Sequence, residues 1–210
     1  MGIFRGKNAK LLTMMTAIAV VIVLFYVALT KKEEEKNSQL TVEAATEVAT
    51  LMDKDLDKEY PASVREVVKL YLRIITCYYN EDLEEKELVT LIDQQRSLFD
   101  KEFLDHNKYG DFKKRLENEI SSYKSANKTV INYQINSNQS VQYWWNNGKE
   151  CASIMVVVNL NGKSLNQVYE KFILRKNDNG KWKILGWQLA DEDDFKSPAP
   201  AKTIAPQSSK

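Results

Sequence analysis

The chain of 210 residues is poor in the side chains from which most metal and disulfide sites are built. It contains one histidine and two cysteines. A single histidine removes most histidine-based metal sites and most histidine-driven acid–base chemistry. Two cysteines far apart in the chain are too few for a disulfide scaffold and form no zinc-type cluster. The sequence therefore predicts no metal ion and no cofactor.

An excess of charge of either sign is also missing. The chain holds 30 Lys and Arg residues against 29 Asp and Glu residues, for a formal net charge of +1. Proteins that bind nucleic acid through bulk electrostatics need a basic face to meet the phosphates. We therefore expect no nucleic-acid partner. The length fits one globular domain with accessory segments.

One long apolar run stands out near the start of the chain. Residues 11–30 contain no charged residue, no proline and no glycine. Twenty helical residues span about 30 Å, the thickness of the hydrocarbon core of a bilayer. The alternative is a cleaved signal peptide, whose apolar core runs only about 7–15 residues before small residues at the cleavage site. The greater length, and the Lys31–Lys32 pair that follows directly, favour a transmembrane helix.

The orientation of this helix follows from its flanks. Lysines and arginines are equally numerous on the two sides, so the positive-inside rule alone gives a tie. The short basic segment 1–10 favours a cytoplasmic N-terminus. We therefore expect a single-pass protein of the cell membrane whose C-terminal domain is extracytoplasmic.

Composition divides the remainder of the chain into three parts. Residues 31–59 carry nine acidic residues against five lysines and few large apolar residues, as is typical of a solvated stalk, partly helical around residues 42–52. Residues 196–210 hold three of the four prolines and no acidic residue, which predicts a disordered tail. The globular domain is therefore expected at residues 60–195.

Within this domain the apolar residues change their period midway. Spacings of three and four predict helices over 61–79, 83–104 (with a possible kink) and 111–124. Alternation, with Asn-Gly turn signals, then predicts strands over 130–136, 140–146, 150–160, 168–176 and 181–190. About three helices followed by about five antiparallel strands is an α+β layout.

This order of elements resembles the NTF2-like (cystatin-like) superfamily, in which a curved sheet wraps a long N-terminal helix to form a cone. The closing hairpin, with the segment KWKILGW at residues 181–187, carries part of the resemblance. The whole chain is also similar to an uncharacterised family of single-pass envelope proteins of Gram-positive bacteria. Its features are the short basic start, the anchor and the segment YPASVREVVKLYLRIITCYYNE at residues 60–81. One fold hosts many functions, so the resemblance implies a fold and not an activity.

A cone of this kind implies a chamber for an apolar ligand. Large side chains on the first helix and on the sheet are the candidates for lining it: Tyr71, Tyr78, Tyr143, Trp145, Met155 and Trp187. The alternative is that the same side chains simply fill the core.

The sequence offers weak evidence for catalysis. His106 falls at a polar helix end, where an exposed cation is mildly favoured. Glu150 and Glu170 fall on strands, at positions that we expect to be polar or at an edge. No carboxylate occupies an obviously apolar strand context, so we predict no catalytic residue.

The cysteines and one tryptophan complete the candidates. Buried cysteine behaves as a small hydrophobe, which we expect for Cys77 and Cys151, although a disulfide outside the cytoplasm stays possible. Alternation sends Trp144 and Trp145 to opposite faces of a strand. We expect Trp145 in the core and Trp144 on the outer surface, where an exposed tryptophan is a candidate contact for a partner.

Three functions are compatible with these features. The first is a membrane-anchored, non-catalytic binding or assembly module of the bacterial cell envelope, whose partner is an envelope protein or a second copy of the chain. A more specific version is a VirB8-like subunit of a conjugation or secretion channel, since those proteins share the plan of an anchor followed by an NTF2-like domain. The third is a small-molecule binder or enzyme that uses the cone.

Overall fold

A computed structural model describes residues 47–162 and 166–196 of the chain. The expected transmembrane helix at 11–30, the first part of the stalk and nearly all of the expected tail lie outside the described residues. Among the residues that are described, no helix combines the length and the apolar character needed to cross a membrane.

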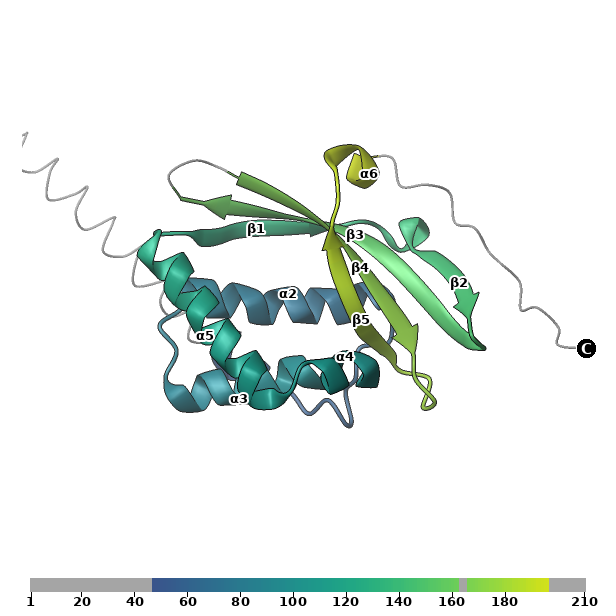
Figure 1. Cartoon of the computed structure of the whole chain (residues 1–210), viewed down its shortest axis with the longest axis horizontal. Coiled ribbons are helices and arrows are strands. Elements are labelled where there is room, and N and C mark those ends of the chain that lie inside the picture. The colour runs from purple at the N-terminus through teal and green to yellow at the C-terminus, as the bar shows by residue number, and fades with distance from the viewer. Residues whose placement is uncertain (1–46, 163–165, 197–210) are drawn as a thin grey trace, which may run out of the picture. The chain divides into compact units, whose positions relative to one another are not determined.

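Among the described residues, a helical segment at 47–52 and four labelled helices precede the sheet (Figure 1): α2 (Val64–Asn80), α3 (Glu85–Ser97), α4 (Lys101–His106) and α5 (Tyr109–Ser125). Helix α2 is the main packing partner of the sheet. Helix α2 begins where the Ser63 hydroxyl accepts a hydrogen bond from the Glu66 amide, at 3.2 Å, which satisfies one of the free amides of the first turn. Ten of its 17 residues are buried. The periodicity of the apolar residues predicted this helix correctly.

The helix expected over 83–104 is two helices separated by residues 98–100. The Ile184 amide donates to the Leu98 carbonyl oxygen, and the Asp100 amide donates to the Ile184 carbonyl oxygen, each at 2.8 Å. These bonds hold the segment alongside the last strand. Asp100 then starts α4, because its side chain accepts from the Glu102 amide. Tertiary hydrogen bonding therefore interrupts an otherwise helical pattern.

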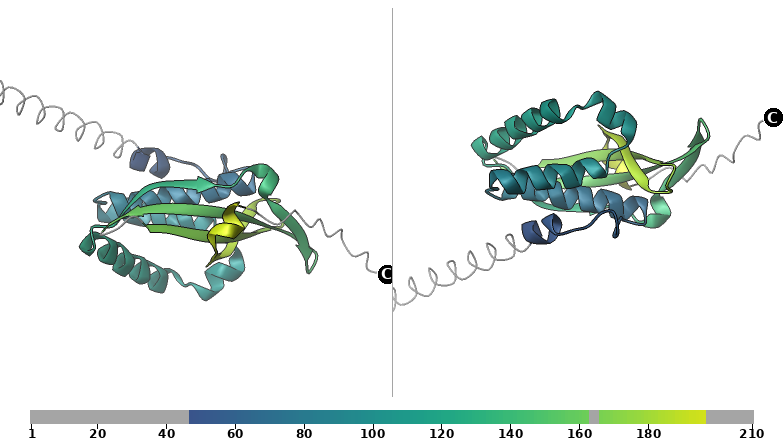
Figure 2. Two further views of the ribbon diagram at one scale, coloured as in Figure 1. Left: turned by 90° about the horizontal axis from the view of Figure 1, so that it is seen from above. Right: turned by 90° about the horizontal axis from the view of Figure 1, so that it is seen from below.

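The five strands form one antiparallel sheet, as expected: β1 (Thr129–Ile135), β2 (Gln142–Asn146), β3 (Lys149–Asn161), β4 (Asn166–Lys176) and β5 (Trp182–Leu189). The strand order is β1-β3-β4-β5, and β2 also pairs with β3. Strand β1 pairs with the second half of β3 and β2 with its first half, so the two share one edge of the longest strand. The end of the sheet formed by β2 extends past the helices (Figures 1 and 2).

The core lies between one face of this sheet and α2. Every second residue of β3 belongs to it, from Ala152 through Ile154, Val156 and Val158 to Leu160. Figures 1 and 2 show α2 running along the sheet, with α5 set apart from α2 at the side of the domain. A short helix, α6 (Glu192–Lys196), which the sequence analysis did not anticipate, follows the last strand.

Packed residues extend upstream of the expected domain start at residue 60. Residues 47–52 are helical, and Val48, Leu51 and Leu56 belong to the core. Arg73 on α2 donates to both carboxylate oxygens of Glu47, at 2.6 and 2.9 Å. The second half of the expected stalk is therefore part of the domain, because its few apolar residues complete the cover of α2.

Candidate functional site

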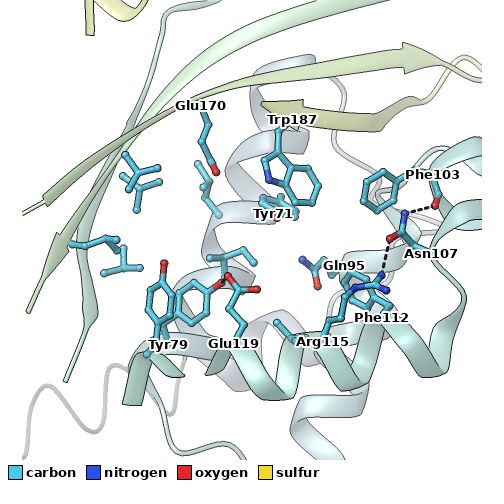
Figure 3. Close-up of a pocket in the computed structure, with 18 residues that line it drawn as sticks. Tyr71, Tyr79, Gln95, Phe103, Asn107, Phe112, Arg115, Glu119, Glu170 and Trp187 are labelled. Atoms are coloured by element: carbon cyan, nitrogen blue, oxygen red, sulfur yellow. Dashed lines mark hydrogen bonds between the residues drawn. The ribbon is translucent and has the colours of Figure 1, made fainter. Parts of the chain in front are cut away.

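A cavity of about 290 Å³ lies between the sheet, α2 and α5 (Figure 3). Its floor is Tyr71, Leu72 and Ile75 of α2. Residues of all the long strands contribute to its roof, including Val158, Val168 and Trp187. Helix α5 closes one side with Phe112, Arg115, Leu116, Glu119 and Tyr123. The volume is at the lower limit of the range usual for small-molecule sites.

Aromatic rings form much of the apolar wall. Trp187 of β5 lies with its ring centroid 5.3 Å from that of Tyr71 and 5.5 Å from that of Phe103. Phe172 stacks behind Trp187 at 5.8 Å. These contacts fix the indole of Trp187 at the edge of the cavity, where part of it is left uncovered by protein.

The carboxylate of Glu170 points into this apolar space from β4 (Figure 3). Glu170 is paired with Val156, so it occupies the core side of the sheet. Burial, and secondly the negative charge of Glu119, raise the pKa of Glu170 from its ordinary 4.5 to about 7. Among the described residues, Glu170 makes no hydrogen bond and no ion pair. A half-buried carboxyl group without a cation is therefore exposed to whatever enters the cavity.

A second carboxylate faces the cavity from α5. Glu119 accepts a hydrogen bond of 2.7 Å from the hydroxyl of Tyr79. The Tyr79 ring stacks on Tyr123, with centroids 4.0 Å apart. These contacts tie α5 to α2 at the same end of the cavity as Glu170 (Figure 3).

A buried amide group underlies the floor. Gln95 of α3 is 2% exposed and accepts from the Tyr78 hydroxyl at 3.1 Å. Burial, followed by the charges of Glu170 and Glu119, raises the pKa of Tyr71, and Gln95 opposes this only in part. Both tyrosines are therefore neutral hydroxyl groups at physiological pH.

The opposite end of the cavity carries its only basic side chain among the lining residues, Arg115. Arg115 donates to the Asn107 side-chain oxygen at 2.7 Å, and Asn107 donates to the Phe103 carbonyl oxygen at 2.9 Å (Figure 3). The cavity thus has an acidic end, formed by Glu119 and Glu170, and a polar end closed by this chain of bonds.

Two of the six predicted lining residues, Tyr71 and Trp187, do line the cavity. Tyr78 is fully buried behind Gln95. Met155 is nearly buried on the other face of β3, beside a shallow hollow with Lys171 and Gln188. Tyr143 and Trp145 are paired with Ala152 and Glu150, on the expected face of the sheet. They stay 38% and 43% exposed, because that end of the sheet extends past the helices (Figure 1).

The expectation for the two adjacent tryptophans is therefore reversed. Trp144, expected on the outer surface, is half-buried opposite Cys151. Trp145, expected in the core, is the more exposed of the two. Cys77 and Cys151 are both buried and free, so the disulfide that the sequence left possible is not formed.

Glu170 is the site residue that the sequence analysis misplaced. The sequence predicts a polar or edge position for it. In the structure it shares its face of β4 with Val168, two positions before it, and with Phe172 and Leu174, two and four positions after it. The alternation of this strand contained the signal. His106, in contrast, is exposed at the end of α4, as expected.

The described residues contain no group of three or more His, Cys, Asp and Glu side chains placed to hold a metal ion.

The chain matches a family model over most of its length. The family model described as Domain of unknown function (DUF6715) covers residues 2–187. No curated protein matches the chain.

Proposed function

We propose that this chain, which belongs to the DUF6715 family, is a binding protein that holds a small, largely apolar molecule in the cavity between α5 and the sheet. The observation that carries the proposal is the unpaired carboxyl group of Glu170 inside an apolar, partly open cavity. Burying such a group costs folding free energy. A ligand that meets it offsets that cost.

Other features of the cavity support binding over a simple packing defect. Two rings of its wall, Trp187 and Tyr71, are held in place by neighbouring rings. They offer a ligand apolar contact area, and their side chains lose little conformational entropy on binding. Helix α5 has one fully buried residue among 17, so it can move away from the sheet more cheaply than α2 can. A ligand can therefore enter without opening the core.

The test is to purify the full-length chain and look for a retained molecule by native mass spectrometry. Indole serves as a neutral apolar probe, with binding followed by NMR. A Val158→Trp variant, which fills the cavity, should lose both the retained molecule and indole binding. If wild type and variant behave alike, the cavity is not a binding site.

We also infer a membrane context and a fold family from the sequence. The apolar run at residues 11–30 would anchor the domain in the cell membrane, with the domain extracytoplasmic. Helices followed by a curved antiparallel sheet, with the cavity enclosed between them, support assignment to the NTF2-like superfamily. In this setting the protein would present its cavity outside the cell.

One observation favours a second function, that of an assembly module of the envelope. Tyr143 and Trp145 are exposed aromatic side chains on β2, at the end of the sheet that extends past the helices. Aromatic residues of this kind are typical contact points between proteins. An envelope protein or a second copy of the chain would bind there, as the VirB8-like version of this function also requires.

A further inference from the structure

We propose that the ligand of the cavity is an organic amine, bound as a cation between Glu119 and Glu170 with its apolar body against Trp187. This inference rests on the proposed binding function, and it adds the chemical class of the ligand.

One end of the cavity is acidic. Glu119 enters from α5 and Glu170 from β4, so two carboxylates face one space from opposite walls (Figure 3). The negative charge of Glu119 adds to the effect of burial in raising the pKa of Glu170. A cation placed between them removes this repulsion and supplies the missing hydrogen-bond donors.

The other titratable groups at this end of the cavity do not balance the charge of Glu170. The titratable groups that face this space are Glu119, Arg115 and Tyr123 of α5, Tyr71 and Tyr79 of α2, and Glu170 itself. The Tyr79 hydroxyl is already donated to Glu119. Arg115 is bonded to Asn107 at the other end. Within the described chain, no protein cation pairs with Glu170, so the ligand has to bring one.

Aromatic rings form the wall beside the two carboxylates. The rings of Trp187 and Tyr71 line the same cavity. A cation within about 6 Å of such a face is attracted by the negative charge of the ring. An anionic ligand would instead meet two carboxylates, and a neutral one would bring no positive charge to balance the ionised Glu170.

The cavity volume limits the size of the amine. A space of about 290 Å³ holds one aromatic ring with a short chain, or an aliphatic chain of similar bulk. We therefore chose 2-phenylethylamine, 2-phenylethanol and 3-phenylpropionate as probes, because they share one body and carry a cationic, a neutral and an anionic head.

The experiment is calorimetric titration of the full-length chain with the three probes at about pH 8, where Glu170 is mostly ionised. The amine should bind about tenfold or more tighter than the alcohol, since a charge-assisted hydrogen bond is worth about 1.5–3 kcal/mol. The carboxylate should bind most weakly. On lowering the pH to about 5.5, affinity for the amine should fall while affinity for the alcohol should not.

Two variants test whether Glu170 causes the preference for the amine over the alcohol. Glu170→Gln keeps the shape of the side chain and should bring the amine and the alcohol to within about threefold of each other. Glu117→Gln removes the same charge from an exposed position on α5 and should leave the preference intact. If Glu170→Gln does not fold, Glu119→Gln replaces it and should reduce the preference.

The outcomes separate the two proposals. Equal binding of amine and alcohol to wild type would overturn the amine inference and leave a binding cavity. A preference that survives both Glu170→Gln and Glu119→Gln would overturn it as well. If none of the probes binds and indole does not bind either, the proposed function itself fails.

Discussion

Glu170 on β4 lies directly opposite Val156 on β3, which places a carboxylate on the side of the sheet that forms the core. An ionised group there has lost much of its water and has gained no partner among the described residues. The physical consequence is a folded state that binds a proton at Glu170 more tightly than the unfolded chain does.

The first prediction is that stability falls as the pH rises through this region. The pKa of Glu170 is about 7 in the folded protein against an ordinary 4.5. Because the folded value is the higher one, protonation favours folding, and the contribution is lost between about pH 4.5 and pH 7. Replacing Glu170 by Gln should therefore stabilise the protein by about 1–3 kcal/mol at high pH and by much less at about pH 5.

Urea unfolding followed by tryptophan fluorescence measures this difference. All four tryptophans lie in the described domain, at positions 144, 145, 182 and 187, so the signal reports on that domain within the full-length chain. Glu117→Gln is the control. A Glu170→Gln variant that is less stable than wild type at both pH values would show that Glu170 has a stabilising partner.

The second prediction concerns the ion pair between β4 and the start of α4. Arg175 donates to both oxygens of Asp100, at 3.1 and 2.5 Å, and Asp100 is 5% exposed. Burial acts to raise the pKa of Asp100, but the bonds from Arg175 and from the Glu102 amide outweigh it and hold the pKa below its ordinary value. The pair therefore stabilises the fold above about pH 4 and ceases to do so as the pH falls below that.

Asp100→Asn should cost about 2–4 kcal/mol at neutral pH, because it leaves Arg175 without its main partner. The same urea titration measures the loss. Asp178→Asn is the matched control: its ion pair with Lys149 is exposed, so the change should stay within about 0.5 kcal/mol. Equal effects of the two substitutions would mean that burial of Asp100 contributes nothing.

Most of the fold could be predicted from the sequence. The errors of the prediction share a cause, which is contact between residues far apart in the chain. Period and turn signals gave every long helix and all five strands within a few residues. They missed the break at residues 98–100, because it depends on hydrogen bonds to Ile184, more than 80 positions away. They also missed the packing of Leu51 and Leu56, since a sparse apolar pattern among acidic residues predicts a solvated segment.

The site could be predicted only in part. Tyr71 and Trp187 were found because they carry large rings on core-facing positions. The cavity itself depends on how far α5 stays from the sheet, which no local pattern encodes. Glu170 was within reach of the sequence, because Val168, Phe172 and Leu174 place position 170 on the core face. The prediction was wrong because a charged residue was expected on the solvent side of the sheet, although the alternation of the strand places position 170 on the core side.

The third prediction concerns the mobility of α5. The bond from Tyr79 to Glu119, together with the stacked ring of Tyr123, connects this helix to α2. Tyr79→Phe should speed amide hydrogen exchange over residues 109–125 by about threefold to tenfold. This factor corresponds to the net free energy that one hydrogen bond contributes to stability. Exchange in α2 should not change. Lys114→Gln, at an exposed position on the same helix, is the control, and uniform acceleration across the domain would contradict a local role.

The last prediction separates packing from partner binding on β2. Trp144 is half-buried opposite Cys151, whereas Tyr143 and Trp145 are exposed on the other face of the strand. Trp144→Ala should therefore destabilise the protein by about 1–3 kcal/mol, and Trp145→Ser by less than about 1 kcal/mol.

If the exposed face of β2 binds an envelope protein or a second copy of the chain, crosslinking in intact cells should recover that partner from wild type. The Tyr143→Ser/Trp145→Ser double variant should lose it, with a smaller loss of stability than Trp144→Ala causes. Crosslinks that persist in the double variant would assign the contact to another surface, and a double variant as unstable as Trp144→Ala would show that these rings serve the fold.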